Sequence, residues 1–344
     1  MPPRRVTRRN PPITSTQPPP PPQYNPVAIQ AAVDAAKILI PKGGKKEENR
    51  APPQAKGKWP VIGHLHLLGS SGLPHRVLAK LSERYGPIFT IMLGVHNALV
   101  VSSNDIAKEC FTIKDKAFCS RPKLMEMELM GYNYAIFALA PYGDYWRQVR
   151  KIIMLHVLSP KRVEMLAPIR VLELRASMAE IYAAWLKNKE TTGSDVVKLD
   201  MQQWFGTLIL NGLLWVVAGK RLSLNDEEGI RFQKVARKFF QLLGAFVVSD
   251  FIPSLKRFDI GGYEREMRIP GKEMDEIFDG WLEEHKRKRK SKQQDEGNQV
   301  LMDVLISIVE GASEEEFPGH DSDTIIKATC LTMLIAGLDI TAVT

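Results

Sequence analysis

The segment "CLTMLIAGLDITAVT", residues 330–344, places a glycine and a carboxylate inside an apolar helical pattern. Gly337 in a helix interior costs about 1 kcal/mol relative to alanine. Asp339 in apolar surroundings is costly unless it is paired or used. The small side chains of Ala336 and Gly337 leave room for a flat group to approach the backbone. A buried helix with one glycine and a half-exposed aspartate would show the same letters, so the segment alone leaves both interpretations open.

A second segment, "APYGDYWRQVRKI", covers residues 140–152. Pro141 and Gly143 break the chain before a helix in which Trp146 and Arg150 stand four residues apart, so both lie on one helix face. An indole N–H and a guanidinium on one face are donors suited to a carboxylate or a phosphate. An amphipathic helix with an ordinary surface arginine would show the same spacing.

The remaining pattern predicts a mainly helical chain with a small β element. The segment "PIFTIMLGVHNALVVSS", residues 87–103, predicts a hairpin around a Gly-Val-His-Asn turn. A helix capped by Ser103 or Asn104 follows it. Apolar residues at three- and four-residue spacing predict helices over 144–157, 160–187, 200–218, 227–246, 264–290, 299–310 and 322–344.

Composition separates a tail from a domain. The first 51 residues are rich in proline and arginine and predict a disordered tail, while 52–344 has the texture of a folded domain. The net charge of +8 is concentrated in the N-terminal tail and in "HKRKRKSK", residues 285–292. Runs of this kind are usually solvated surface, so we expect no nucleic-acid partner. Neither a signal peptide nor a confident membrane span is found.

Six segments occur in an order that resembles cytochrome P450 monooxygenases, most of all the plant microsomal type. They are "WPVIGHLHLL", "YGPIFTIMLG", "FCSRPK", "APYGDYWRQVRKI", "DFIPSLKRFDIGGYEREM" and "AGLDIT". The resemblance runs from about Pro52 to Thr344 and implies a mainly α fold with a small β region, incomplete at the C-terminus. It also implies a haem cofactor, iron protoporphyrin IX, held between two helices.

The resemblance assigns roles to residues that match the family's motifs. It implies donors to a haem propionate (Trp146, Arg150 and Arg121), small residues over the face where oxygen binds (Ala336 and Gly337), and an acid and an alcohol for proton delivery (Asp339 and Thr341). The family's alcohol normally follows the acid directly, and Ile340 stands there in this chain. One residue along a helix is about 100° of rotation, so Thr341 should point elsewhere.

The haem iron of this family is bound by a cysteine thiolate in a C-terminal loop. Cys110, Cys119 and Cys330 stand in other contexts, and the three lack any C-x-x-C pair. None is carried over as the axial ligand, so no metal ligand is assigned and we expect the chain to be inactive alone. A fragment, a mis-spliced gene product or a pseudogene product would have these features.

The implied function is a haem-thiolate monooxygenase that inserts one atom of O₂ into a small hydrophobic substrate of secondary metabolism. An NADPH-dependent reductase would supply electrons, and the location would be the endoplasmic reticulum membrane, although no anchor is recognisable. Leu124–Leu139 lies where the family places its first substrate-recognition loop. The alternative function is that of a non-catalytic helical fragment whose basic ends bind partners.

Overall fold

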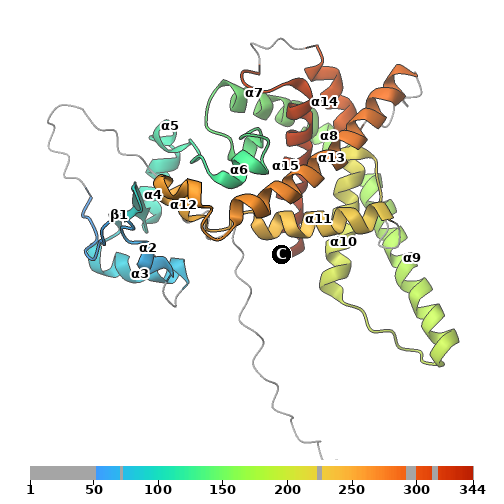
Figure 1. The fold of residues 1–344 in the computed structure, drawn as a ribbon. Coiled ribbons are helices and arrows are strands. Elements are labelled where there is room, and N and C mark those ends of the chain that lie inside the picture. The colour runs from blue at the N-terminus through green and yellow to red at the C-terminus, as the bar shows by residue number, and fades with distance from the viewer. Residues whose placement is uncertain (1–51, 70–72, 223–226, 292–299, 312–316, 344) are drawn as a thin grey trace, which may run out of the picture.

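The computed structural model describes residues 52–69, 73–222, 227–291, 300–311 and 317–343, with side chains as far as Leu338. The tail predicted over 1–51 lies outside these residues. In Figure 1 the β hairpin and the first helices form one end of the molecule, and the remaining helices form a larger body beside it.

The predicted hairpin is confirmed, with a shorter turn. Strand β1 (Ile88–Leu93) pairs antiparallel with β2 (His96–Val101), and Leu93 lies opposite His96. The turn is therefore Gly94 and Val95 alone, and His96 already belongs to the second strand. Gly94 has φ 58°, and a Cβ there would overlap the carbonyl of Phe251, so the turn needs glycine.

The helices follow in chain order and are drawn in Figure 1. They are α2 (Leu65–Gly69), α3 (Pro74–Tyr85), α4 (Asn104–Phe111), α5 (Asp115–Phe118), α6 (Met125–Leu129), the 3₁₀ turn η1 (Phe137–Leu139), α7 (Asp144–Ile152), the π turn η2 (Ile153–Val157), α8 (Pro160–Met165), α9 (Ala167–Thr192), α10 (Met201–Ala218), α11 (Glu227–Leu242), α12 (Val248–Phe251), the 3₁₀ turn η3 (Pro253–Phe258), α13 (Tyr263–Lys290), α14 (Leu301–Val309) and α15 (Ser322–Val343).

Two predicted helices differ from the structure in continuity or type. The segment predicted as one helix over 160–187 is two, α8 and α9, with Leu166 between them. Pro168 stands in the first turn of α9, where its missing N–H costs nothing, and this position favours a new helix start. The helix predicted over 144–157 keeps its length, but its last turn is the π turn η2.

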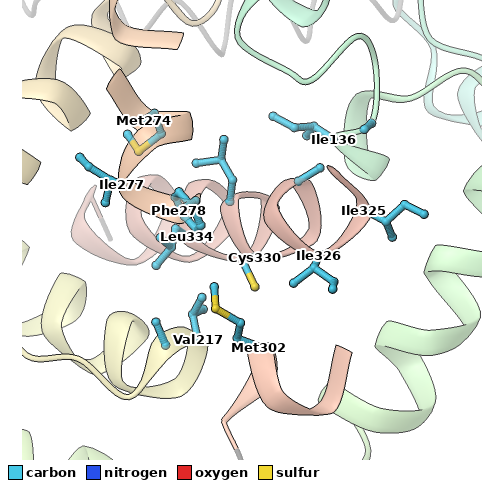
Figure 2. Close-up of a cluster of buried hydrophobic side chains, with 14 of the residues drawn as sticks. Ile136, Val217, Met274, Ile277, Phe278, Met302, Ile325, Ile326, Cys330 and Leu334 are labelled. Atoms are coloured by element: carbon cyan, nitrogen blue, oxygen red, sulfur yellow. The ribbon is translucent and has the colours of Figure 1, made fainter. Parts of the chain in front are cut away.

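Helix α15 lies at the centre of the main core. It packs against α10, α13 and α14, and its buried apolar side chains include Ile325, Ile326, Cys330 and Leu334. Figure 2 shows side chains of α13 on one side of this helix, with Val217 of α10 and Met302 of α14 on the other. The apolar pattern that predicted α15 is therefore its packing surface against three other helices.

The fold class predicted from the sequence is confirmed: the described residues are mainly helical, with a two-stranded sheet. A smaller core joins this sheet to the helical body, because Phe251 and Ile252 pack against Phe89 and Ile91. Among the described residues, none of the helices has the length and apolar run needed to cross a bilayer.

Candidate cofactor site

Helix α7 is fixed by one buried face. Tyr145, Val149 and Ile152 are buried in the main core. The hydroxyl of Tyr145 donates a hydrogen bond of 2.6 Å to the carbonyl of Ala135, and burial raises the pKa of this phenol. The helix is thereby tied to the segment 124–139, and its neighbouring face is turned outward.

Trp146 and Arg150 share that outward face, as their spacing predicts. The ring of Trp146 is half-buried and lies 5.3 Å from the ring of Tyr142, centroid to centroid. The guanidinium carbon of Arg150 lies 4.9 Å from the centroid of the Trp146 ring. Arg150 is exposed and pairs with none of the described carboxylates, whereas Arg147 on the same helix pairs with Asp144. The pair is therefore a guanidinium on an aromatic platform, with its charge available to an anion.

Arg121 is placed separately. It is exposed, and its guanidinium donates to the carbonyl of Cys119 at 3.0 Å. The structure gives it no hydrogen bond, ion pair or ring contact with Trp146 or Arg150. Its part in binding a propionate, which the resemblance implies, stays a prediction.

The two small residues of α15 have different surroundings. Ala336 is exposed, whereas Gly337 is half-buried. A Cβ on Gly337 would lie 2.7 Å from both methyl groups of Leu213 on α10. The absence of a side chain at Gly337 therefore lets α10 pack closely against α15. The exposed Ala336, with its small side chain, leaves the backbone of α15 accessible. Asp339 and Thr341 belong to α15, but their side chains lie outside the described residues.

The cysteines do not fit the thiolate that the family uses. Cys330 is fully buried in α15, and burial raises the pKa of its thiol. Burial and the Glu109 carboxylate raise the pKa of the Cys110 thiol as well. A raised pKa opposes the thiolate form that ligates iron. The described residues contain no group of three or more histidine, cysteine or acidic side chains that could hold a metal ion. The roles of Trp146, Arg150 and Ala336 toward a haem, and the assignment of no axial ligand, stay predictions.

Sequence reasoning missed a buried charge cluster. Lys327 of α15 is 7% exposed, and its ammonium lies 2.6 Å from Asp275 and 2.7 Å from Asp279 of α13. Its signal was present in "TIIKATCLTML", where a single lysine interrupts an otherwise uncharged buried stretch. Such a lysine needs partners, but the sequence does not say which ones.

The segment Leu124–Leu139 was predicted only as a recognition loop, yet most of it is ordered structure. It contains α6 and η1, and it buries Met125, Met127 and Ile136. Between these helices lies a turn in which three successive residues have positive φ angles.

Comparison with known proteins shows the family to which the chain belongs. The sequence profile of the family described as "Cytochrome P450" matches residues 52–344. The chain is 46% identical over 308 residues to strychnine-10-hydroxylase of Strychnos nux-vomica and 46% identical over 299 residues to flavonoid-6-hydroxylase of Mentha piperita. It is 44% identical over 306 residues to demethylepipodophyllotoxin synthase of Sinopodophyllum hexandrum. These alignments cover 88%, 86% and 86% of this chain, in that order, and 57% of each relative.

A solved structure shows the same fold at low sequence identity. The structure of zebra fish cytochrome P450 with progesterone matches with a TM-score of 0.59 and 19% identity, over 79% of this chain and 58% of that one.

Proposed function

Because the chain belongs to the cytochrome P450 family, we propose that it forms part of a haem-thiolate monooxygenase that inserts one oxygen atom into a small hydrophobic secondary metabolite. The observation that carries the proposal is the exposed Arg150 guanidinium over the Trp146 ring, without a carboxylate partner among the described residues. The related strychnine and flavonoid hydroxylases support an aromatic, multi-ring substrate.

The residues of α7 would hold the cofactor. The Arg150 guanidinium and the Trp146 indole N–H can donate to a propionate, and charge-assisted bonds of this kind are about twice as strong as neutral ones. Arg121, to which the resemblance gives the same role, would add a further positive charge for the propionate. Bound haem supplies the activation of O₂, which no side chain of the chain can perform.

The residues of α15 would act on the distal side. Ala336 leaves the helix backbone approachable, since its methyl group is small and exposed. Asp339 would move protons to the oxygen site, with Thr341 as the alcohol that the chain offers nearest to it. Ile340 can neither donate nor accept a proton at the family's usual alcohol position, so proton delivery is weaker than in a chain with threonine there.

Further parts of the proposal come from the family. An NADPH-dependent reductase would donate electrons, O₂ would be the second substrate, and the location would be the endoplasmic reticulum membrane. The axial thiolate would have to come from residues other than Cys110, Cys119 and Cys330. The chain spans 57% of its relatives' length, so these statements concern the whole protein.

Haem retention in two arginine variants tests the proposal. A chimera would join Thr344 to the C-terminal part of strychnine-10-hydroxylase, and haem per protein would be measured as the pyridine haemochrome. Arg150→Ala removes a charge-assisted bond worth roughly 1.5–3 kcal/mol, so the haem dissociation constant should rise about 10- to 100-fold. Arg147→Ala is the matched control, because Arg147 lies on the same helix and already pairs with Asp144. Equal retention in both variants would contradict the assignment of α7.

The alternative is a non-catalytic helical protein with basic ends that bind a partner. The structure weakens the charge available for it, because Lys288 pairs with Glu284 and Arg289 pairs with Glu310 near the end of α13. Failure of the chimera to bind haem, together with binding of an acidic partner, would favour this second function.

A further inference from the structure

The turn between α6 and η1 has a strained backbone. Tyr132, Asn133 and Tyr134 have φ angles of 53°, 51° and 70°, in the left-handed region that residues other than glycine rarely adopt. Three such residues in succession cost conformational free energy, and strain of this kind persists only where surrounding contacts enforce it. We therefore ask which contacts hold this turn in its strained conformation.

Main-chain bonds secure the turn from the α6 side. The amide of Tyr134 donates to the carbonyl of Met127 at 2.9 Å, and that of Asn133 donates to the carbonyl of Glu128 at 3.3 Å. Aromatic side chains secure it from outside, since the ammonium of Lys123 lies 5.8 Å from the centroid of the Tyr134 ring. These contacts are local in sequence.

Contacts of Tyr132 join the turn to the central helices. The ammonium of Lys327 on α15 lies 5.5 Å from the centroid of the Tyr132 ring. The same ammonium is bound by Asp275 and Asp279, which stand four residues apart on α13. An ammonium has three N–H donors, so two carboxylates and one ring face use its whole capacity. Three parts of the chain meet at this one cation.

Burial makes the arrangement specific to Lys327. The lysine is 7% exposed, so its charge persists because the two aspartates compensate for lost solvation. Asp275 and Asp279 have side chains 39% and 54% exposed, so they remain partly hydrated. The Tyr132 hydroxyl is buried and lies near the Asp275 carboxylate, and burial and this carboxylate together raise the pKa of the phenol. The ring of Tyr132, and not its hydroxyl, is therefore what the cation contacts.

The turn continues directly into residues that pack on α15. Ile136 follows the turn closely in sequence, it is buried, and Figure 2 shows it beside α15. η1, which follows, also packs against α15. A change in the turn would therefore move the apolar residues that this segment presents beside the distal helix.

We propose that Lys327 is a positioning residue for the substrate-recognition segment: it holds the strained turn 132–134 through the face of Tyr132 and so sets the place of Ile136 and η1. The inference rests on the proposed function, because it takes the segment 124–139 to be one that recognises the substrate. Its test does not need bound haem, so the two can fail separately.

Hydrogen exchange of the chain as printed, read by mass spectrometry on peptides covering 127–139, tests the proposal. Lys327→Met keeps the length of the side chain and removes its charge, and exchange of the amides of 133–136 should become at least tenfold faster. Amides of α10, which does not contact the cation, should be unchanged. Lys327→Arg keeps the charge and should restore protection to within about threefold of the parent.

The matched control is Lys286, which also bridges the two helices. It extends from α13 to Asp323 of α15, with a side chain 19% exposed, and it does not contact the turn. Lys286→Met should leave exchange in 133–136 within twofold of the parent. Equal acceleration by Lys286→Met, or none by Lys327→Met, would overturn the proposal.

Two variants of Tyr132 test the proposal even if Lys327→Met fails to fold. Tyr132→Leu removes the ring and leaves the ion pairs in place, and it should accelerate exchange of 133–136 at least tenfold. Tyr132→Phe keeps the ring that faces the cation and removes only the hydroxyl near Asp275, so exchange should stay within twofold. Acceleration by Tyr132→Phe as large as that by Tyr132→Leu would show that the hydroxyl, and not the cation contact, holds the turn.

Discussion

The buried pair of His285 and Asp303 offers the strongest test of how α13, α14 and α10 are held together. His285 Nδ1 lies 2.7 Å from Asp303 Oδ1, and His285 Nε2 lies 3.1 Å from the carbonyl oxygen of Ala218. Both side chains are buried, at 6% and 7% exposure. A carboxylate and a carbonyl only accept hydrogen bonds, so each ring nitrogen faces an acceptor, and the two side chains form a buried ion pair when the imidazole is protonated. Asp303 Oδ2 also accepts from the amide of Val300 at the start of α14.

The magnitude follows from burial. Removing one partner of a buried ion pair leaves the other charge uncompensated, at a cost of roughly 3–5 kcal/mol. Asp303→Ala should therefore lower the free energy of unfolding by about 3–5 kcal/mol, including the lost bond to Val300. With a urea m-value of about 3 kcal/mol/M, the midpoint should fall by about 1–1.7 M. Asp303→Asn keeps the shape and one of the two acceptor oxygens, so it should lose less than Asp303→Ala.

A double-mutant cycle isolates the pair. The variants are Asp303→Asn, His285→Gln and their combination, with urea unfolding followed by far-UV circular dichroism and by tryptophan fluorescence. Groups in direct contact within one network couple by about 0.5–3 kcal/mol, and a charged, buried pair belongs in the upper half of that range. We expect a coupling free energy of at least about 1.5 kcal/mol.

An exposed pair on the same helix is the control. Arg231 and Glu276 also join α13 to a neighbouring helix, at 2.7 Å, but their side chains are 52% and 49% exposed. Exposed pairs typically couple by about 0.2–1 kcal/mol, so the same cycle should give a clearly smaller value here. If the two cycles gave equal coupling, burial would not be what makes the His285 pair strong, and the reasoning would be refuted.

Three further predictions follow from other parts of the chain. Hydrogen bonds from Lys288 and Lys220 lower the pKa of Glu284 from 4.5 to about 2, so this carboxylate stabilises the fold above pH 4.5 and the contribution is lost as the pH falls toward 2. Glu284→Gln should therefore reduce the drop in urea midpoint between pH 7 and pH 3, and an unchanged drop would contradict this sign. Because Cys330 is fully buried, Ellman's reagent should react rapidly with only the other two cysteines of the folded chain and with all three after unfolding; three rapid equivalents before unfolding would contradict the core position. In the chimera supplied with reductase, Ile340→Thr should raise the product formed per NADPH oxidised, since a positioned acid–base group is typically worth about 10²–10⁴ in rate; equal coupling in parent and variant would show that another group already delivers the proton.

Local pattern was sufficient for the elements that carry the candidate site. The spacing that put Trp146 and Arg150 on one face is confirmed by their stacking at 4.9 Å, because i,i+4 neighbours on a helix meet whatever the rest of the fold does. The hairpin and the central helix α15 were likewise predicted from periodicity. The family was recognisable from six segments in order, and the profile match over 52–344 confirms it.

The ends of helices and turns were less predictable, because they depend on how single residues interact with their neighbours in the fold. The sequence predicted one helix over 160–187, but Pro168 favoured a second start there. It predicted a four-residue hairpin turn, but His96 pairs with Leu93, and the amide of Val95 in the two-residue turn donates to the carbonyl of Phe251. That contact joins residues more than a hundred positions apart, so no local sequence pattern predicts it.

The sequence by itself determined the helical class, the family and the faces of α7 and α15, since these depend on residues within one or two turns of each other. Only the tertiary structure decided which carboxylates meet Lys327, that Gly337 admits Leu213, and that the turn at Tyr132 is strained. A buried charge needs a counter-charge, and a residue without a side chain leaves space for a neighbour, but the sequence does not show which residue will be that partner. The partner is chosen by the packing of whole helices, which brings Asp275 to Lys327 across 52 positions of sequence.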